Sequence, residues 1–589
     1  MTTDETFNRR LTIVGVALVG ISLVLLVRML SFQFYMDPDT KQSLEENQEN
    51  RIYQTVRVRP NRGQIYDRNG HLLAVNSYEY RIGISPNMVL DRQEAAADLA
   101  PLVGLPENQI FHALEPDEEG TFREWVLLAA RVDFETGQKI MDLDIDGIDI
   151  EALPIRIYPQ GELTAQLVGF YAGSEDDDDG RGYSGVEGFY DALLAGQSKR
   201  VTLSVIPVLE ENETDTRVRN GIDLVLTIDR DLQFLAQEVL DQAIVEQGAT
   251  GGTILIMNPR NGEILAIANY PTFKSDDFSP ENMELISNQA VSSTYEPGSV
   301  FKVLTMAIAI ESGIDYQTWT YHDPGTWEVA GIAISNWDRR ARSTPNFNQV
   351  FIESLNTGTA TLFYQIGPRT VYPMLREFGI GTPAGVDLEG ESAGLLVEMG
   401  DSNWSEAQFL TTSFGQGVSV TPLQMLTAVN AIANGGLIMQ PHIVKARIDG
   451  DEVIETQPSA SYRPISSQTA NIARDIMVQI VESPESLDDY HFENYKVAGK
   501  TGTAQIPTAG GYYDPEDSIA SFVGFLPADD PVVSVLVKLD RPDGYWGSKT
   551  AAPVFQKLVE KLVVLMEIPP DMVRYQLEAQ GGNPFEREY

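Results

Sequence analysis

Apolar residues are distributed unevenly along this chain. Near the N-terminus they form one long run. Leu11–Val27 holds 17 residues without a charge, after which Arg28 interrupts the run and Met29–Phe34 extends it. About 20 helical residues cross the hydrocarbon core of a bilayer, so this run predicts a transmembrane helix over residues 11–34. The alternatives are a buried core helix and a cleaved secretory signal, although no small-x-small cleavage site follows the run.

The charges on either side of the run indicate an orientation. Arg9 and Arg10 precede it, whereas acidic residues such as Asp37 and Asp39 follow it. By the positive-inside rule, residues 1–10 form a cytoplasmic tail and the rest of the chain lies outside the membrane. We therefore expect a single-pass protein of the cell membrane whose large domains are extracytoplasmic.

Residues 35–220 are rich in short strand patterns, turns and acidic loops, which predicts a β-rich domain. The clearest loop carries Asp176–Asp179. Four adjacent carboxylates suggest calcium, but they lack the alternating ligand spacing and the distal glutamate of an EF-hand loop. A solvated acidic loop is the preferred interpretation. The polar stretch Glu211–Arg219 suits a domain boundary.

Residues 221–568 alternate between strand and helix patterns. Strand pairs at both ends, with helices between them, predict one antiparallel sheet closed by the two termini of the domain. The Asn261-Gly262 pair predicts a tight hairpin within the first strand pair. The predicted strands are Leu224–Ile228, Thr253–Met257, Ile264–Ala268, Ala520–Leu526 and Val532–Leu539. One predicted helix starts at Asp231 and buries Leu232, Leu235, Val239 and Ala243; another starts near Pro553 and buries Phe555, Leu558, Leu562 and Met566.

The composition excludes or disfavours several kinds of chemistry. With 589 residues the chain has room for several domains, and its formal charge of −43 disfavours binding to a phosphate backbone. The absence of cysteine excludes disulfides and thiolate chemistry, and the five histidines show no ligand spacing such as i, i+4. We expect no metal, no cofactor and no nucleic-acid partner.

Ser299 is a candidate nucleophile, because it forms a Ser-x-x-Lys sequence with Lys302. Pro297 and Gly298 predict a turn, and Val300–Ile310 is an apolar helical run, so Ser299 is expected in the first turn of a buried helix. Free N–H groups there favour an oxyanion, and the shared helix face brings the Lys302 amine to the Ser299 hydroxyl. Apolar surroundings favour a neutral amine that acts as a general base. An N-cap serine beside an unrelated lysine is the alternative.

Two further motifs follow in the order described for serine enzymes that react with penicillin. Ser354-Leu355-Asn356 is a Ser-x-Asn sequence, and Lys500-Thr501-Gly502-Thr503 begins with Lys-Thr-Gly. Each motif is common alone, but their order and spacing together indicate one site.

With this triple, the sequence resembles the class B penicillin-binding proteins over nearly its whole length. Other segments match motifs of that family before, between and after the three elements. These segments are Arg62–Gly70, Leu73-Ala74, Arg156–Pro159, Gly169-Phe170, Gly185–Gly188, Ser413–Gly417, Thr421–Gln424 and Ser521–Phe525.

The resemblance implies a multidomain α+β protein: a transmembrane anchor, an elongated β-rich pedestal, and a transpeptidase domain whose antiparallel sheet is sandwiched by helices. In the pedestal, a buried Arg62 paired with Asp67 or Glu187 is expected to lock the structure rather than to contact substrate. The expected divisions are a cytoplasmic tail at 1–10, the anchor at 11–34, the pedestal (dimerisation-type) domain at 35–220, the transpeptidase domain at 221–568 and a C-terminal tail at 569–589.

The resemblance also implies roles for the first two motifs. Ser299 attacks the carbonyl between the last two D-alanines of a peptidoglycan stem peptide, and Lys302 takes its proton. Ser354 relays a proton to the leaving amine, while Asn356 orients Lys302 and binds a substrate amide. Leu355 stands where division-type relatives usually carry a second serine, and it does not touch this chemistry.

The third motif is implied to bind substrate. Lys500 supplies positive charge for the substrate carboxylate, and Thr501 and Thr503 are hydroxyl donors. Gly502 lets the substrate backbone approach the strand. The backbone N–H groups of Ser299 and Thr503 form the oxyanion hole.

The implied function is that of a serine-type D,D-transpeptidase, which cross-links stem peptides through a serine acyl-enzyme during septal cell-wall synthesis and is a target of penicillin. The Glu296–Gly298 lead-in and the segments 520–527 and 532–542 resemble the division type; an elongation-type enzyme is the alternative. A hydrolytic relative, such as a β-lactamase or carboxypeptidase, and a β-lactam-binding sensor or inactive scaffold are further alternatives. Expected partners are stem peptides, β-lactams, a polytopic membrane glycan polymerase of the SEDS type and other division proteins, with the polymerase contacted through the anchor and pedestal.

Overall fold

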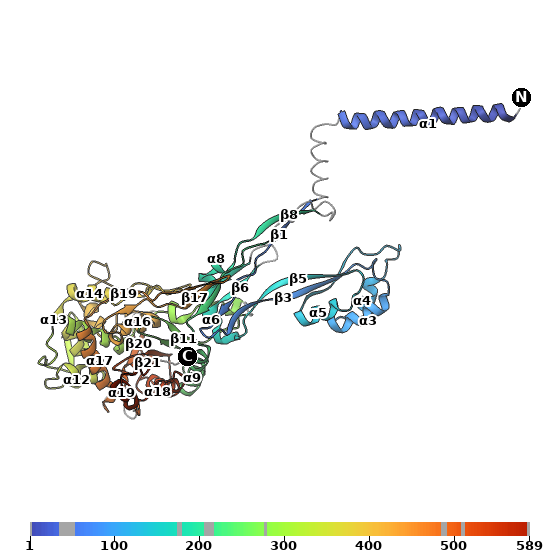
Figure 1. Ribbon diagram of the computed structural model, residues 1–589. Helices are drawn as coiled ribbons and strands as arrows, with labels where there is room; N and C mark the ends of the chain where they lie inside the picture. Colours follow the sequence, from blue (N-terminus) through green and yellow to red (C-terminus); the bar gives the residue numbers. More distant parts are fainter. Residues whose placement is uncertain are drawn as a thin grey trace. The chain divides into compact units, whose positions relative to one another are not determined.

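The computed structural model describes residues 3–34, 53–173, 180–204, 217–275, 280–484, 492–507 and 513–585 (Figure 1). These residues fall into two compact units. One consists of residues up to 60 together with 196–220, and the other of residues 61–195 and 221–589. The acidic loop at Asp176–Asp179 lies outside the described residues, as does most of the polar stretch Glu211–Arg219.

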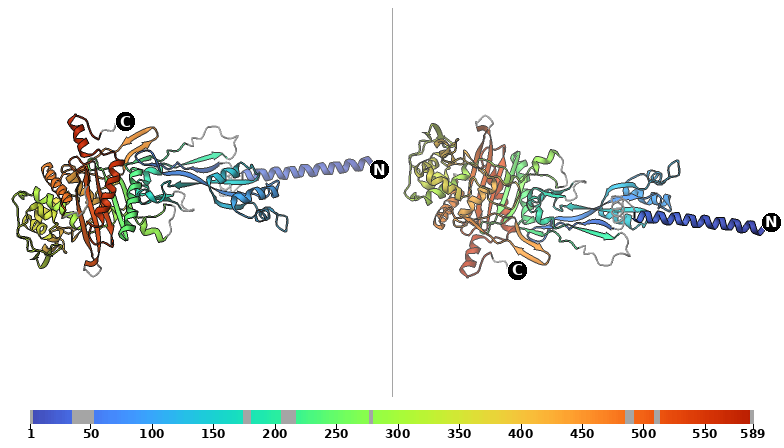
Figure 2. Two further views of the ribbon diagram at one scale, coloured as in Figure 1. Left: turned by 90° about the horizontal axis from the view of Figure 1, so that it is seen from below. Right: turned by 90° about the horizontal axis from the view of Figure 1, so that it is seen from above.

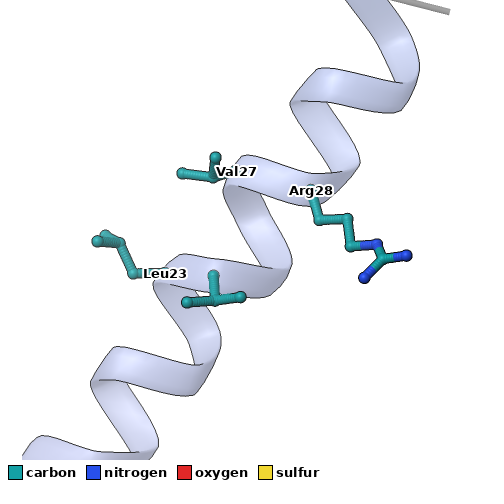
Figure 3. Close-up of a pocket in the computed structure, with 4 residues that line it drawn as sticks. Leu23, Val27 and Arg28 are labelled. Carbon is teal, nitrogen blue, oxygen red and sulfur yellow. The ribbon is translucent and has the colours of Figure 1, made fainter.

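The first unit contains the predicted membrane helix. Helix α1 (Thr3–Phe34) is continuous, and its residues 12–30 are long and apolar enough to cross a membrane. Figure 3 shows Leu23 and Val27 on one flank of this helix and Arg28 on another, with all three side chains directed away from the helix axis. The prediction of a helix over 11–34 is confirmed, and the helix begins earlier, at Thr3.

The first unit also contains a pair of strands from distant parts of the chain. β1 (Tyr53–Val58) runs antiparallel to β8 (Lys199–Ser204), with Val56 opposite Val201. The expected pedestal segment, residues 35–220, therefore contributes to both units.

In the second unit, a seven-stranded sheet joins segments from before and after residue 220. Its order is β18-β17-β9-β2-β3-β4, and β5 also pairs with β3. Strand β2 runs parallel to β9, where the buried side chains of Ile65 and Leu224 stand opposite one another. The strands are β2 (Ile65–Tyr66), β3 (Leu72–Ile84), β4 (Val126–Val132), β5 (Ile148–Ile157), β9 (Asp223–Leu226), β17 (Val444–Asp449) and β18 (Glu452–Glu455).

Three short helices pack against the far ends of β3, β4 and β5 and form a small core of their own with them (Figure 1). Local signals set the bounds of the first helix: the Asp91 carboxylate accepts hydrogen bonds from the N–H groups of Gln93 and Glu94, and Gly104 ends the helix in a left-handed conformation. The helices are α3 (Arg92–Val103), α4 (Glu107–Leu114) and α5 (Phe134–Met141).

One buried carboxylate connects the N-terminal motifs. Glu187, whose side chain is fully buried, accepts from Arg62 Nε at 2.7 Å and from Arg156 Nε at 2.8 Å. Arg62 also bonds Asp191, at 2.8 Å. The expected pairing of Arg62 with Glu187 is therefore present, whereas the Asp67 carboxylate accepts instead from the backbone of Asn69 and His71.

Around this carboxylate lie the short elements that connect the sheet to the rest of the unit. They are η1 (Gly161–Thr164), α6 (Ala165–Val168), β6 (Phe170–Ala172), β7 (Arg181–Tyr183), α7 (Gly185–Phe189) and α8 (Asp191–Leu194).

The largest part of the second unit is organised around a five-stranded antiparallel sheet in the order β11-β10-β22-β21-β20. The predicted sheet, closed by strand pairs from both ends of the domain, is confirmed, but the strand predicted at 224–228 is not part of it: this segment forms β9, which pairs with β2 and β17 in the seven-stranded sheet. The strands of the five-stranded sheet are β10 (Gly251–Met257), β11 (Ile264–Tyr270), β20 (Ala498–Pro507), β21 (Tyr513–Leu526) and β22 (Val533–Asp540).

Both faces of this sheet are buried. Because successive strand residues point to opposite faces, Ile254 and Ile256 pack in one core while Leu255 and Met257 pack in another. Helices α9 (Arg230–Gln247) and α18 (Ala551–Leu565) cover the first face, and α16 (Pro422–Ala433) lies on the second (Figures 1 and 2). Helix α11 (Lys302–Glu311) packs in the same core as α16. The sheet sandwiched by helices is confirmed.

The predicted helices at the two ends of this domain are present. In α9, Leu232, Leu235, Val239 and Ala243 are all buried, as expected. In α18, Phe555, Leu558 and Leu562 are buried, whereas Met566 follows the end of the helix and is half-buried. Beyond it, the segment expected as a C-terminal tail contains α19 (Asp571–Ala579), whose Arg574 is fully buried beside Asp529 and Asp571.

The remaining helices and strands lie between β11 and β20. They are η3 (Pro280–Leu285), α10 (Gln289–Ser292), η4 (Gly298–Phe301), β12 (Thr326–Val329), β13 (Ile332–Ser335), α12 (Phe347–Ile352), α13 (Asn356–Ile366), α14 (Pro368–Glu377), β14 (Leu395–Leu396), α15 (Glu406–Thr412), β15 (Val418–Ser419), β16 (Ile438–Met439), β19 (Ala460–Tyr462) and α17 (Ser467–Glu482).

We expect Glu187→Gln to destabilise the second unit. It leaves the buried guanidinium of Arg156 without a carboxylate, and removing one partner of a buried ion pair costs about 3–5 kcal/mol of unfolding free energy. Hydrogen exchange of the amides in β2, β3 and β5 measures this loss. The matched control is Glu79→Gln, which breaks an exposed pair with Arg131 and is expected to cost less than about 1 kcal/mol. Equal losses in the two variants would contradict the interpretation.

Candidate active site

The three sequence motifs meet at the edge of the five-stranded sheet. Ser299 lies in the 3-10 turn η4, and Lys302 is the first residue of α11. Ser354 lies between α12 and α13, and Asn356 is the first residue of α13. The Lys-Thr-Gly-Thr segment is part of β20, the edge strand that packs against η4.

Lys302 is the centre of this arrangement. Its side chain is fully buried, and its Nζ donates to the Ser354 carbonyl at 2.7 Å, to Asn356 Oδ1 at 2.7 Å and to Ser354 Oγ at 3.1 Å. Burial, with the nearby charge of Lys500 as a second cause, lowers the pKa of Lys302 well below its usual value. The amine is therefore able to lose its proton at far lower pH than an exposed lysine.

Ser299 joins this cluster through the other serine. Ser354 Oγ lies 3.2 Å from Ser299 Oγ, so a hydrogen-bonded chain runs from Ser299 through Ser354 to Lys302. The sequence predicted that the amine would reach the Ser299 hydroxyl directly; in the structure, the hydrogen bonds of Lys302 go to the Ser-x-Asn motif, and Ser354 stands between the two groups.

The backbone at Ser354 is strained. Its φ of 56° is in the left-handed region, which costs a residue with a Cβ about 1–2 kcal/mol. The following Leu355, noted from the sequence as a departure from division-type relatives, is fully buried in the core, so its apolar side chain lies away from the polar cluster. This conformation turns both the carbonyl and the hydroxyl of Ser354 towards Lys302.

The turn that carries Ser299 is pressed against β20. Gly298 has a φ of 58°, and a Cβ at this position would lie 2.6 Å from the Thr503 carbonyl oxygen. The Gly298 N–H also donates to the Gly415 carbonyl at 3.1 Å. Consistent with this crowding, α11 is preceded by a 3-10 turn rather than by the α-helical turn that the sequence suggested.

Lys500 is buried in β20, and its Nζ donates to the Thr501 carbonyl at 3.2 Å. Burial lowers the pKa of Lys500 to about 8. Packing also favours glycine at position 502, because a Cβ there would lie 2.5 Å from Ser521 Oγ and 2.8 Å from a methyl carbon of Val300. The absent side chain therefore allows the η4 turn to approach the strand, in addition to the substrate approach inferred from sequence.

Thr503 connects β20 to the loop that precedes α18. The Gly547 N–H donates to Thr503 Oγ1 at 2.9 Å, which leaves the threonine hydroxyl proton available to another acceptor. Beside Gly547, the exposed ring of Trp546 meets the exposed ring of Trp337 edge to face, with centroids 5.9 Å apart. Trp337 follows the end of β13, so the two rings connect the segment after β13 with the loop before α18.

Sequence reasoning gave no role to Glu296, although it belongs to the turn before Ser299. Its Oε1 accepts from the Gly417 N–H at 2.9 Å, and Tyr513 donates to Oε2 at 3.1 Å. Burial raises the pKa of this carboxyl. The sequence signal is the Ser413–Gly417 family motif, whose Gly417 is the residue that bonds Glu296.

The chain matches two family models. The penicillin binding protein transpeptidase domain matches residues 252–560, and the penicillin-binding protein dimerisation domain matches residues 57–226. Stage V sporulation protein D of Bacillus subtilis is 31% identical over 578 residues, covering 96% of this chain and 87% of the relative. The probable peptidoglycan D,D-transpeptidase PbpC of Pseudomonas aeruginosa is 28% identical over 570 residues, covering 96% of each chain.

Solved structures agree with this grouping. The crystal structure of penicillin binding protein 3 from Mycobacterium tuberculosis, complexed with aztreonam, superimposes with a TM-score of 0.67 at 29% identity, covering 87% of this chain and 98% of the other. A transpeptidase-type domain joined to a dimerisation-type domain defines the architecture. The chain belongs to the class B penicillin-binding proteins.

We expect Gly298→Ala to loosen the contact between η4 and β20. The methyl group would clash with the Thr503 carbonyl, in addition to the strain of about 1–2 kcal/mol that a Cβ suffers at positive φ. Gly313→Ala, beyond the other end of α11, is the matched control because it has a φ of 88° and nothing within 4 Å of an added Cβ. In thermal unfolding of the transpeptidase domain, Gly298→Ala is expected to lower Tm at least twice as much as Gly313→Ala; equal shifts would rule out the clash.

Proposed function

We propose that this protein is a peptidoglycan D,D-transpeptidase that acts through an acyl-enzyme on Ser299. The observation that carries the proposal is the buried Lys302 amine, linked through Ser354 to the Ser299 hydroxyl. A neutral buried amine with a hydrogen-bonded path to a hydroxyl is what activates a serine nucleophile. The relative whose name states peptidoglycan D,D-transpeptidase activity covers nearly the whole chain and supports the choice of reaction.

In the acylation half, Ser299 Oγ attacks the carbonyl carbon between the last two D-alanines of a stem peptide. The Ser299 proton passes to Ser354, whose own proton passes to the neutral Lys302 amine. The backbone N–H groups of Ser299 and Thr503 form the oxyanion hole, and donors of this kind contribute about 3–4 kcal/mol each. When the C–N bond breaks, the proton passes from Lys302 back to Ser354, whose own proton passes to the leaving nitrogen, and D-alanine departs.

In the second half, the amine of a neighbouring stem attacks the ester. Its proton moves to Lys302 through Ser354 and then to Ser299 Oγ as the C–O bond breaks, which forms the cross-link and regenerates the serine. Asn356 holds Lys302 in place through the 2.7 Å bond to its Oδ1 and also binds a substrate amide. The reaction is acyl transfer in two steps and requires no cofactor.

The substrate carboxylate is bound by the third motif. Lys500 provides the positive charge, and Thr501 and Thr503 provide hydroxyl donors. The bond from Gly547 to Thr503 Oγ1 supports this assignment, because it occupies a lone pair and directs the hydroxyl proton elsewhere. Gly502 allows close approach to the strand.

We also propose on which side of the membrane each part of the chain lies. The anchor at 11–34 puts residues 1–10 in the cytoplasm, and the pedestal (35–220) and transpeptidase domain (221–568) act outside the membrane, with 569–589 as the C-terminal segment. The basic residues before the apolar run support this orientation. We also propose that the protein works in septal synthesis, beside a SEDS-type glycan polymerase and other division proteins. The resemblance of the Glu296–Gly298 lead-in to the division type supports this proposal.

The first test is covalent labelling. Detergent-solubilised protein incubated with a fluorescent penicillin is expected to give a stable adduct of one penicilloyl group by intact-mass spectrometry, and Ser299→Ala is expected to give none. Ser312→Ala, just after the end of α11, is the matched control and should be labelled like the unmodified protein. An adduct that vanishes within seconds would indicate a hydrolase, and folded protein without an adduct would favour a scaffold.

The pH dependence of labelling tests the role of Lys500. Its pKa of about 8 means that the positive charge is present below that value and is lost above it. The second-order rate constant for acylation by a carboxylate-bearing β-lactam is therefore expected to fall by about tenfold per pH unit once the pH exceeds 8, because this constant reports ionisation of the free enzyme. Lys500→Arg keeps its charge and should abolish this alkaline decline, even if its rate is lower. A flat alkaline profile in the unmodified protein would contradict the assignment.

A further inference from the structure

The strained conformation of Ser354 requires support from elsewhere in the fold. A φ of 56° is unfavourable for serine, and the helix that follows has no side-chain cap from its own N-cap residue, Leu355. The Ser354 carbonyl and hydroxyl both contact Lys302, so a small relaxation of this turn would move two of the three acceptors of the amine. Residues that hold the first turn of α13 in place therefore also hold Ser354 and Asn356 against Lys302.

A residue from another segment caps this helix. Asn336, just after β13, accepts the Thr357 N–H on its Oδ1 at 3.2 Å. The preceding carbonyl, that of Ser335, accepts from Asn356 Nδ2 at 2.9 Å. With its amide nitrogen held there, Asn356 presents its Oδ1 to Lys302 at 2.7 Å. The end of β13 thus orients Asn356 and Thr357 together.

A buried carboxylate fixes both Asn336 and Thr357. Asp323 is fully buried; its Oδ1 lies 2.8 Å from Thr357 Oγ1 and accepts the Gly325 N–H at 2.9 Å. Asn336 Nδ2 bonds both carboxylate oxygens, at 3.0 and 2.9 Å. Tyr321 OH lies 3.0 Å from Thr357 Oγ1 and belongs to the same hydrogen-bonded group. An anion at this place also interacts favourably with the N-terminus of α13.

We propose that Asp323 is a positioning residue for the acylation reaction, which it serves through Thr357 and Asn336 by holding Ser354 and Asn356 against Lys302. The inference rests on the proposed function of Ser299 and Lys302. No sequence motif contains Asp323, Asn336 or Thr357, and none of the three bonds Lys302 directly. Their effect is one of geometry: displacement of catalytic groups by about 1 Å can cost about a hundredfold in rate.

The decisive comparison uses two substitutions at one position. Thr357→Val keeps the shape of the side chain and removes its hydroxyl, whereas Thr357→Ser keeps the hydroxyl. The readout is the first-order rate constant for labelling of the detergent-solubilised full chain at saturating fluorescent penicillin. Because this constant is measured on molecules that become labelled, it does not depend on the fraction that is folded. We expect a ten- to hundredfold decrease for Thr357→Val and for Asp323→Asn, and a change of less than about threefold for Thr357→Ser.

A matched control separates positioning from stability. Thr227 is fully buried and donates to the Ile264 carbonyl at 2.6 Å, in the segment between β9 and α9. Thr227→Val therefore removes a buried hydroxyl at a comparable cost in Tm, but is expected to retain the labelling rate constant of the unmodified protein.

The outcomes distinguish this inference from the function on which it rests. If the unmodified protein forms an adduct and Thr357→Val forms it at the same rate constant, Asp323 and Thr357 are structural only and the inference is overturned. An equal decrease for Thr227→Val would overturn it as well. If the unmodified protein forms no adduct, the proposed function itself fails. Should Asp323→Asn not fold, the Thr357 pair decides alone.

Discussion

The arrangement of the transpeptidase-type domain depends on the burial of one lysine amine. Lys302 begins a helix that runs through the core, and its amine bonds Ser354 and Asn356 rather than a carboxylate among the described residues. An amine in this setting is stable only if neutral or surrounded by acceptors. The Ser-x-Asn motif supplies those acceptors, and it does so at the cost of a strained backbone at Ser354. The strained backbone of Ser354 and the hydrogen-bonded path to Ser299 both accompany these contacts.

The sheet provides the second part of the site. β20 is the edge strand, and two glycines allow the nucleophile turn to lie directly against it: Gly298 avoids the Thr503 carbonyl, and Gly502 avoids Ser521 and Val300. The contact brings Ser299 and Thr503 together without any bond between their side chains. Thus the separation of Ser299 and Thr503, whose N–H groups we propose as the oxyanion hole, is set by backbone packing, which side-chain substitutions elsewhere on the strand would alter little.

Much of the fold was predictable from the sequence, because it is encoded in local patterns. The apolar run of α1, the spacing of buried residues in α9 and α18, and the hairpin at Asn261-Gly262 each lie within one segment. That the three motifs would come together was also predictable, because their order along the chain is a sequence property. The geometry of the site was not: the left-handed φ of Ser354 and the position of Ser354 between Ser299 and Lys302 arise from contacts across about 50 residues of chain.

The hydrogen bonds behind the site and the strand pairing of the pedestal were also not predictable from the sequence. Asp323, Asn336 and Thr357 are unremarkable in sequence, and only packing makes them neighbours. Likewise, the sequence pattern of residues 35–220 predicts one domain, yet in the structure β1 and β8 belong to one compact unit with α1. Pairing between distant strands has no local signature, since a strand carries the same alternation whatever its neighbour is.

The parallel pairing of β2 with β9 has a consequence for how the chain is made. β2 and β3 are synthesised early, but β9 is flanked on its other side by β17, which follows more than 200 residues later. Until that strand arrives, the growing sheet keeps an open edge, and open edges invite pairing with other chains. The pedestal motifs and the catalytic domain are therefore completed together, and an enzyme shortened after β9 would carry an unprotected strand rather than an independent pedestal.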